Sequence, residues 1–183
     1  MKQLITYYIP CIVTVFTVTM FFSCKDNYNE VQKIGVSENE PIGEAENFNL
    51  KYTDSGKVTR HLIGKKMFDY TNRDFPYYEF TDGVILNIFD KDKKSTVVSD
   101  YAVVYDKTSI IDLQGNVVIT THDNRILKSD QLYFDRKKEW LFTNQPVTFT
   151  SGQDIIHGNG FDSNGEFSNA EVLEVTGIFT VEE

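Results

Sequence analysis

The alternation of apolar and polar residues is the feature that most constrains this chain. In Leu113–Asp135, "LQGNVVITTHDNRILKSDQLYFD", the alternation runs twice, with a polar turn between the two halves. Side chains two residues apart project from the same side of a strand, so this stretch predicts a hairpin with one apolar face. Similar short runs follow one another from Phe48 onward, and no segment there has a convincing 3.6-residue period. The pattern predicts an all-β domain, and the 14% of aromatic residues is typical of strands.

The hairpin recurs in three successive blocks of about 30 residues. Each block holds a strand, a polar turn, a second strand that ends near an Asp, another polar turn and a third strand. Asp100 and Asp130 lie 30 residues apart, as do Val117 and Val147, so the register holds between blocks. A weaker copy begins at Asn49. A block of this size cannot bury its own apolar face, so the repeats predict a stack of antiparallel strands forming two facing sheets with a shared interior. Such a stack ends in strand edges that need a cap or recruit another strand.

The alternation assigns a set of apolar side chains to the interior. Either these residues line an apolar groove that holds a lipid, or they form the ordinary core of a closed β-sandwich. The candidates for lipid binding are Val84, Leu86, Ile88, Ala102, Val104, Ile111, Leu113, Val117, Ile119, Leu132, Phe134, Leu141, Val147, Phe149 and Phe161.

The N-terminus has the form of an export signal. Lys2 precedes an apolar stretch that contains no other charged residue before Lys25. The segment "FFSC" resembles a bacterial lipobox, although bulky Phe22 stands where a small residue is more common. We expect residues 1–23 to be a signal peptide and Cys24 to be lipidated; the alternative is a signal anchor that remains as a membrane-spanning helix.

The segment after Cys24 is rich in Glu and Asn and has no apolar period. We expect residues 24–47 to comprise the lipidated cysteine and a polar linker, and residues 48–183 to form the β-domain. Both forms of anchor place this domain outside the cytoplasm. Asp26, close to the cysteine, is compatible with a sorting signal, so the outer membrane or the cell surface are alternatives to the inner membrane.

Charge and residue types argue against several functions. The net charge of −9 and the lack of a basic patch with interleaved aromatics disfavour nucleic acid as a partner. Both cysteines precede Lys25, and His61, His122 and His157 are spread over the chain, two of them at predicted turns, so no metal or cofactor site is expected. No catalytic triad is indicated, and a parallel β-helix lyase is the remaining enzyme alternative.

The repeats resemble those of a known family. The segments "GNVVIT" and "SDQLYFD", in a chain that begins with a membrane anchor and a linker, look like the OstA-like repeats of LptC, a family of lipopolysaccharide-export proteins. The likeness covers about residues 48–180. It implies an OstA-like β-jellyroll of stacked antiparallel repeats, shaped like an open, twisted boat. The apparent lipobox departs from the better-known members, which keep a transmembrane helix.

The resemblance also implies a function. Family members receive lipopolysaccharide from the inner-membrane ABC transporter LptBFG and pass it to LptA, which docks edge to edge. The expected protein is therefore a membrane-anchored periplasmic bridge, not an enzyme. The alternative is an envelope lipoprotein module that binds carbohydrate or a protein through outward aromatics such as Tyr101, Tyr105 and Tyr133.

Overall fold

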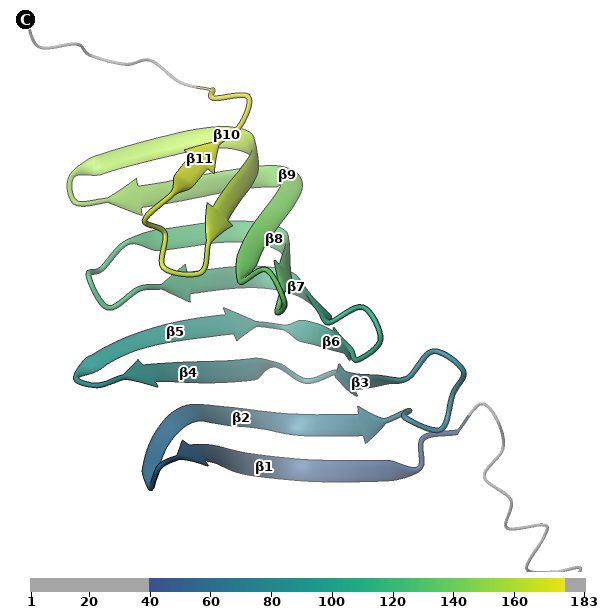
Figure 1. The fold of residues 1–183 in the computed structure, drawn as a ribbon. Coiled ribbons are helices and arrows are strands. Elements are labelled where there is room, and N and C mark those ends of the chain that lie inside the picture. Colours follow the sequence, from purple (N-terminus) through teal and green to yellow (C-terminus); the bar gives the residue numbers. More distant parts are fainter. Residues whose placement is uncertain (1–39, 177–183) are drawn as a thin grey trace, which may run out of the picture. The chain divides into compact units, whose positions relative to one another are not determined.

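The computed structural model describes residues 40–176, which form a single antiparallel sheet of eleven strands. Hairpins stack in chain order from β1 to β10 (Figure 1). The strands are β1 (Gly43–Asp54), β2 (Lys57–Asp69), β3 (Tyr77–Phe80), β4 (Val84–Asp90), β5 (Lys93–Ser99), β6 (Tyr101–Tyr105), β7 (Ile110–Thr120), β8 (Ile126–Asp135), β9 (Trp140–Ser151), β10 (Asp154–Asn164) and β11 (Ala170–Val172).

The prediction of an all-β jellyroll is confirmed, with one refinement. The two facing layers are not separate sheets, because the long strands take part in both. β2 pairs with β4 through Arg60–Gly64 and with β3 through Met67–Asp69. β7 likewise pairs with β5 near its end and with β6 near its start. The sheet is therefore folded along one line of corners into two walls, which we call wall A (β4, β5 and the strand halves beside them) and wall B (β3, β6, β11 and the halves beside them).

The corners explain the 30-residue spacing seen in the sequence. The third strand of the first block and the first strand of the second are one bent strand, β7, whose register shifts between Gln114 and Val117. Gly115 has φ of 72°, and a Cβ there would lie 3.0 Å from the Asp100 side chain. The Asp100 amide donates to the Gly115 carbonyl at 2.9 Å, and the Asn116 side-chain amide donates to the Asp100 carboxylate at 2.7 Å.

Ser129 makes the same corner one repeat later. Its hydroxyl donates to the carbonyls of Gln131 at 2.9 Å and of Pro146 at 3.2 Å, which holds the bend of β8 against that of β9. Asp130 follows Ser129 as Asp100 follows Ser99. The recurring Ser-Asp pair thus marks the position at which each repeat passes from one wall to the other.

The weak first copy is also part of the stack. β1 and β2 pair over nearly their whole length, and β1 begins at Gly43, ahead of Phe48. Phe48 is 7% exposed and contacts Phe80 with ring centroids 5.7 Å apart. The first hairpin therefore adds to the same interior as the three stronger repeats.

Candidate functional site

One row of interior side chains crosses eight strands of wall A. Each member is the register partner of the next, so the row runs the length of the stack without interruption. Seven of its eight side chains are Leu, Ile or Val, and the other is Phe. From β1 to β10 the row consists of Leu50, Leu62, Leu86, Val97, Ile119, Leu127, Phe149 and Ile156.

Wall B faces this row with two shorter rows of the same kind. They bring together side chains from β1 to β9, again as consecutive register partners. The first row consists of Ala45, Met67, Phe80, Ala102, Leu113 and Leu132, and the second of Tyr78, Val104, Ile111, Phe134 and Leu141. The space between the walls is therefore apolar on both sides.

The interior is closed at its C-terminal end. Leu132 and Phe161 have no exposed surface, and Leu127 is 1% exposed. Phe149, Phe161 and Phe167 form a three-ring cluster with centroids 5.5–5.7 Å apart. These rings fill the space between β9, β10 and the turn that follows β10.

Arg125 holds the two walls together at this closed end. It lies in the turn between β7 and β8, on wall A, and its guanidinium donates to the carbonyls of Phe167 and, at 2.9 Å, of Glu166. Asp123 pairs with the same guanidinium at 2.6 Å, and Arg125 together with the Thr121 hydroxyl holds the pKa of Asp123 well below its usual range. The residues between Gly165 and Asn169 belong to wall B, so Arg125 bridges the two walls.

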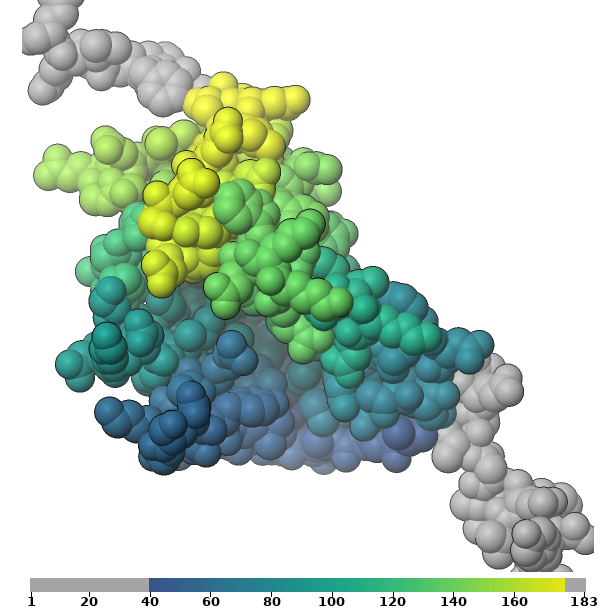
Figure 2. Space-filling view, in the orientation of Figure 1, coloured from purple at the N-terminus to yellow at the C-terminus, as the bar shows by residue number. Residues whose placement is uncertain are grey.

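The interior row becomes accessible toward the N-terminal end. Ile88 is 37% exposed and Leu50 38% exposed, although both lie on the strand faces that carry buried residues further along. In Figure 2 the yellow C-terminal residues lie against the green residues of β8 and β9, the blue β1–β2 hairpin forms the other end, and the face between them is recessed. The structure thus combines the two alternatives, a packed core at one end and an accessible apolar surface at the other.

Thirteen of the fifteen predicted interior residues belong to the buried cluster or pack against it. The two others lie on the accessible part: Leu86 is half-buried and Ile88 exposed. They share a face with buried Val84, so the alternation placed them correctly, but no C-terminal ring cluster covers their end of the wall. Lipid binding by the set as a whole stays a prediction.

Several interior residues were missed. Phe48, Phe80, Leu127 and Phe167 are buried, and Leu62 and Val97 pack against them. Val97 lies in β5, from which no residue was predicted, and Leu127 is out of step with Leu132 and Phe134 because the register of β8 shifts after Ser129. Phe167 lies in a turn, with φ of 57°, where no alternation exists to reveal it.

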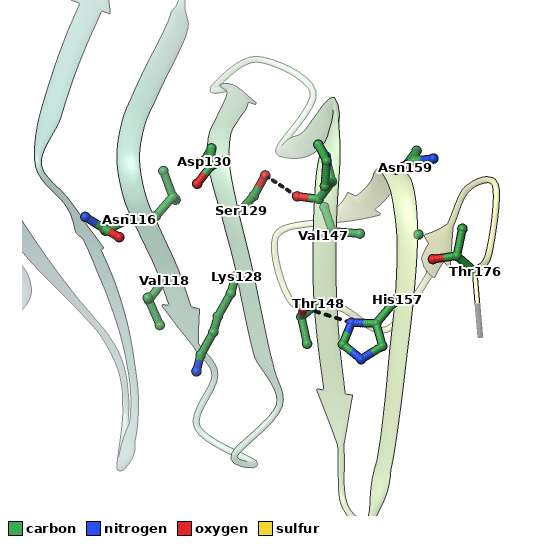
Figure 3. A pocket seen from close by; sticks show the side chains of 13 residues that line it. Asn116, Val118, Lys128, Ser129, Asp130, Val147, Thr148, His157, Asn159 and Thr176 are labelled. Carbon is green, nitrogen blue, oxygen red and sulfur yellow. Dashed lines mark hydrogen bonds between the residues drawn. The ribbon is translucent and has the colours of Figure 1, made fainter. Parts of the chain in front are cut away.

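The hollow drawn in Figure 3 lies on the outer face of wall A and has a volume of about 510 Å³. Lys128, Thr148 and His157 stand on adjacent strands β8, β9 and β10, and the Thr148 hydroxyl hydrogen-bonds His157 Nδ1 at 3.1 Å. Asn116, Asp130 and Asn159 line its other end. None of the lining residues is Phe, Tyr or Trp, so this hollow lacks the large aromatic faces on which sugar rings stack.

Aromatic side chains gather instead on the outer face of wall B. Tyr77 and Tyr105 lie 6.0 Å apart, and Tyr133 stacks on Phe142 at 5.3 Å. The Tyr101 hydroxyl donates to Glu79 at 2.6 Å; burial and this bond raise the pKa of Tyr101 far above its usual range. The three tyrosines expected to face outward therefore do so.

The histidines do not converge. The sequence predicted two of the three at turns, but only His122 lies in a turn, while His61 and His157 lie in β2 and β10. Among residues 40–176, no three His, Cys, Asp or Glu side chains gather in a way that would hold a metal ion. Nor does this part of the chain contain a helix long and apolar enough to cross a membrane. Cys24 and the predicted signal peptide lie outside the described residues.

Comparison with protein-family models identifies the family of this chain. A family model described as LptC, "Lipopolysaccharide-assembly, LptC-related", matches residues 11–180. No curated protein matches the chain.

Proposed function

Since the chain belongs to the LptC-related family of lipopolysaccharide-assembly proteins and so takes part in lipopolysaccharide export, we propose that it carries lipopolysaccharide between its two walls. The family is one of periplasmic transport-bridge proteins associated with the inner membrane, not of enzymes. In this proposal the acyl chains lie along the row from Leu50 to Ile156. The observation that carries it is the continuity of this row over eight strands together with its exposure at the N-terminal end.

The physical basis is the hydrophobic effect. Exposing an acyl chain to water costs about 0.8 kcal/mol for each CH₂, so a lipid with several chains needs a continuous apolar surface during transfer. Leu, Ile and Val side chains on successive strands offer such a surface. Because they are chemically similar, the binding free energy of an acyl chain should differ little from one strand to the next. The protein itself needs no chemistry for this, because the transporter would supply energy from ATP.

The proposed partners act at the two ends of the stack. LptBFG would deliver lipopolysaccharide, and LptA would accept it by pairing with a strand edge. The C-terminal edge offers such a site at the start of β10, because β11 pairs with Phe161–Ser163 and the segment after it hydrogen-bonds His157 and Asn159, which leaves Asp154–Ile156 uncovered. Ile155, in the other half of β10, is 62% exposed. The last apolar run of the sequence, Val172–Thr180, extends beyond the described residues.

We further propose that Cys24 is lipidated and that the polar segment after it tethers the β-domain to the membrane. The segment from Lys25 to Gly43 would span at most about 60 Å if fully extended, at roughly 3.3 Å per residue.

Site-specific photo-crosslinking in cells tests the lipid path, and β4 provides a matched pair of positions. Ile88 faces the interior and is 37% exposed; Ile85 faces outward and is 40% exposed. A photoreactive residue at position 88, or at Leu86, should crosslink to lipopolysaccharide, whereas one at position 85 should not. Equal labelling from positions 85 and 88, or labelling from outward positions alone, would contradict the interior path.

The outer aromatic face of wall B supports a second candidate, a module that binds carbohydrate or a protein partner. Tyr133 and Phe142 form a stacked pair beside Asp112, which is 7% exposed and accepts hydrogen bonds from Gln114 at 2.8 Å and Gln131 at 2.9 Å. Aromatic rings beside fixed polar groups suit the stacking of sugar rings. Crosslinking to glycan or protein from position 133, with none from position 88, would favour this function.

A further inference from the structure

The two hairpins at the accessible end of wall A carry a concentration of positive charge. The β1–β2 and β4–β5 hairpins lie side by side, because β2 pairs with β4. We call their six cationic side chains the basic rim: Lys51, Lys57, Arg60, Lys91, Lys93 and Lys94. Three carboxylates, Asp54, Asp90 and Asp92, share these turns, so the rim has a net charge of 6 − 3 = +3 in a chain whose net charge is −9.

The basic rim is not neutralised by ion pairs. Among residues 40–176, the salt bridges involve Lys66, Arg125, Arg136 and Lys138, and no carboxylate lies within 4.0 Å of a rim cation. On the rim of wall B two of the four cations are paired: Arg136 lies 3.1 Å from Asp106, and Lys138 lies 3.7 Å from Asp135. The basic rim therefore lacks the carboxylate partners that the opposite rim has.

A hollow of about 320 Å³ lies beside the basic rim on the outer face of wall A, opposite the interior row. It is lined by Lys51, Val58, His61, Phe89 and Lys91, without a carboxylate. His61 is held by a 2.7 Å hydrogen bond between its Nε2 and the Asn49 side-chain oxygen. Lys94 is the register partner of Phe89, which places it beside the same hollow. Lysine ammonium groups around a small recess suit a phosphate group, which accepts several charge-assisted hydrogen bonds.

The rim adjoins the accessible part of the apolar interior. Arg60 is the register partner of Ile88, whose side chain lies on the interior face. Tyr52, the partner of Arg60 in β1, is 51% exposed. The interior face therefore ends at this edge in Arg60, with Lys57 and Lys93 beyond it, because these two lysines are the register partners of Asp54 and Asp90 on the same face. This is the arrangement expected for an amphiphile whose acyl chains and phosphate groups are adjacent. A flat bilayer could reach the rim but could not follow the row into the concave space between the walls.

We propose that the basic rim binds the phosphate groups of the glycolipid whose acyl chains occupy the interior. This inference rests on the proposed function and adds to it the part of the lipid that is recognised and its orientation. The acyl chains extend from the rim toward the C-terminal end, and the phosphorylated headgroup stays at the rim, exposed to solvent.

The test measures binding of two lipids to the full-length protein in detergent: lipid A that carries two phosphates, and the same lipid after enzymatic removal of both. A rim variant that removes the interior-face cations, Lys57→Gln/Arg60→Gln/Lys93→Gln, is compared with a control variant of equal charge change on the opposite rim, Lys107→Gln/Lys137→Gln/Lys138→Gln. Hydrogen bonds between charged groups contribute to the binding free energy, so we expect the rim variant to bind phosphorylated lipid A about tenfold more weakly than wild type does. Binding of the dephosphorylated lipid should be the same for all three proteins, and the control variant should behave as wild type.

Several outcomes would overturn the proposal, and they separate it from the proposed function. If the rim variant binds both lipids as wild type does, the rim is not the phosphate site, while the lipid path stands. If wild type binds neither lipid, both proposals fail. If wild type binds phosphatidylglycerol vesicles as tightly as lipid A, and the rim variant loses both, the rim contacts a membrane surface. Saturable binding of inorganic phosphate alone with the affinity of lipid A would assign the hollow to the free anion.

Discussion

Single residues differ widely in what they contribute to this interior, and the difference follows their position along the stack. Phe161 is completely buried and contacts two other rings, whereas Phe142, on the outer face of the neighbouring strand β9, is 37% exposed. Both are phenylalanines in long strands of alternating pattern. Only Phe161 excludes water from the space between the walls.

Replacing Phe161 by Ala should therefore lower the free energy of unfolding by about 3–5 kcal/mol, because it removes a buried ring and leaves a cavity. The measurement is denaturant unfolding of the full chain in detergent. Phe142→Ala is the control and should cost about 1 kcal/mol, since it removes one exposed ring and its stacking on Tyr133. Equal losses in the two variants would show that the ring cluster is not the centre of the core.

At the scale of elements, the position of the corner in each strand determines which residues belong to wall A and which to wall B. The corner of β10 is closely packed against the C-terminal segment: the Asn159 amide donates to the Leu173 carbonyl at 3.0 Å, and the Leu173 amide donates to the Gly160 carbonyl at 3.0 Å. A Cβ at Gly158 would lie 2.3 Å from the Leu173 carbonyl oxygen. The segment after β10 can cover this corner only because position 158 is glycine.

Gly158→Ala should consequently displace the segment from Ala170 to Thr176. The amides of Asn159 and Leu173 lose their acceptors, so their hydrogen exchange should become at least about tenfold faster, equivalent to roughly 1.4 kcal/mol. Gly165→Ala is the control, because a Cβ there meets its nearest atom at an ordinary 3.7 Å. Unchanged exchange at Leu173 in Gly158→Ala would contradict the close contact.

At the scale of the whole described domain, the fold is one sheet wound into two walls, sealed by rings at its C-terminal end and accessible at its N-terminal end. The residues that stabilise the fold and those at the proposed entry of the lipid therefore lie at opposite ends of the stack. Fully buried side chains lie mainly in β7–β10, and the half-exposed part of the row lies in β1, β2 and β4. Lipid would enter at the N-terminal end, where the apolar side chains are already accessible and few packed contacts would have to be broken.

Attachment of the whole molecule is tested by labelling cells with an alkyne analogue of palmitate. We expect the wild-type protein to be labelled, and Cys24→Ala to lose the label, because acylation requires that thiol. Cys11→Ala is the matched control and should keep it, since position 11 precedes the expected cleavage site. Label on Cys24→Ala, or none on wild type, would favour a signal anchor instead.

Much of the fold follows from local pattern. Val117, Ile119, Leu132 and Phe134 were placed in the interior from alternation alone, because a strand presents every second side chain to the same face. The Ser-Asp pair at Ser99 and Ser129 was visible as a repeat, but its role as a corner was not, since a corner is defined by the neighbouring strand to which it bonds.

The candidate site depended more strongly on tertiary structure. Leu86 and Ile88 have the same pattern as buried Val84, yet they stay accessible because the ring cluster closes only the other end. The lysines of "FDKDKKS" belong to one hairpin turn, and they form a rim with further cations only because β2 carries Lys57 and Arg60 alongside β4.

The sequence by itself thus determined the strand content, the 30-residue repeat and the apolar face of each strand, because these depend on residues close together in the chain. Which end of the interior is sealed, where the walls meet and which charges share a rim were decided by the tertiary structure alone. Those properties arise from pairing between segments distant in the sequence, such as Arg125 with Phe167 and Arg60 with Ile88, and no local pattern records it.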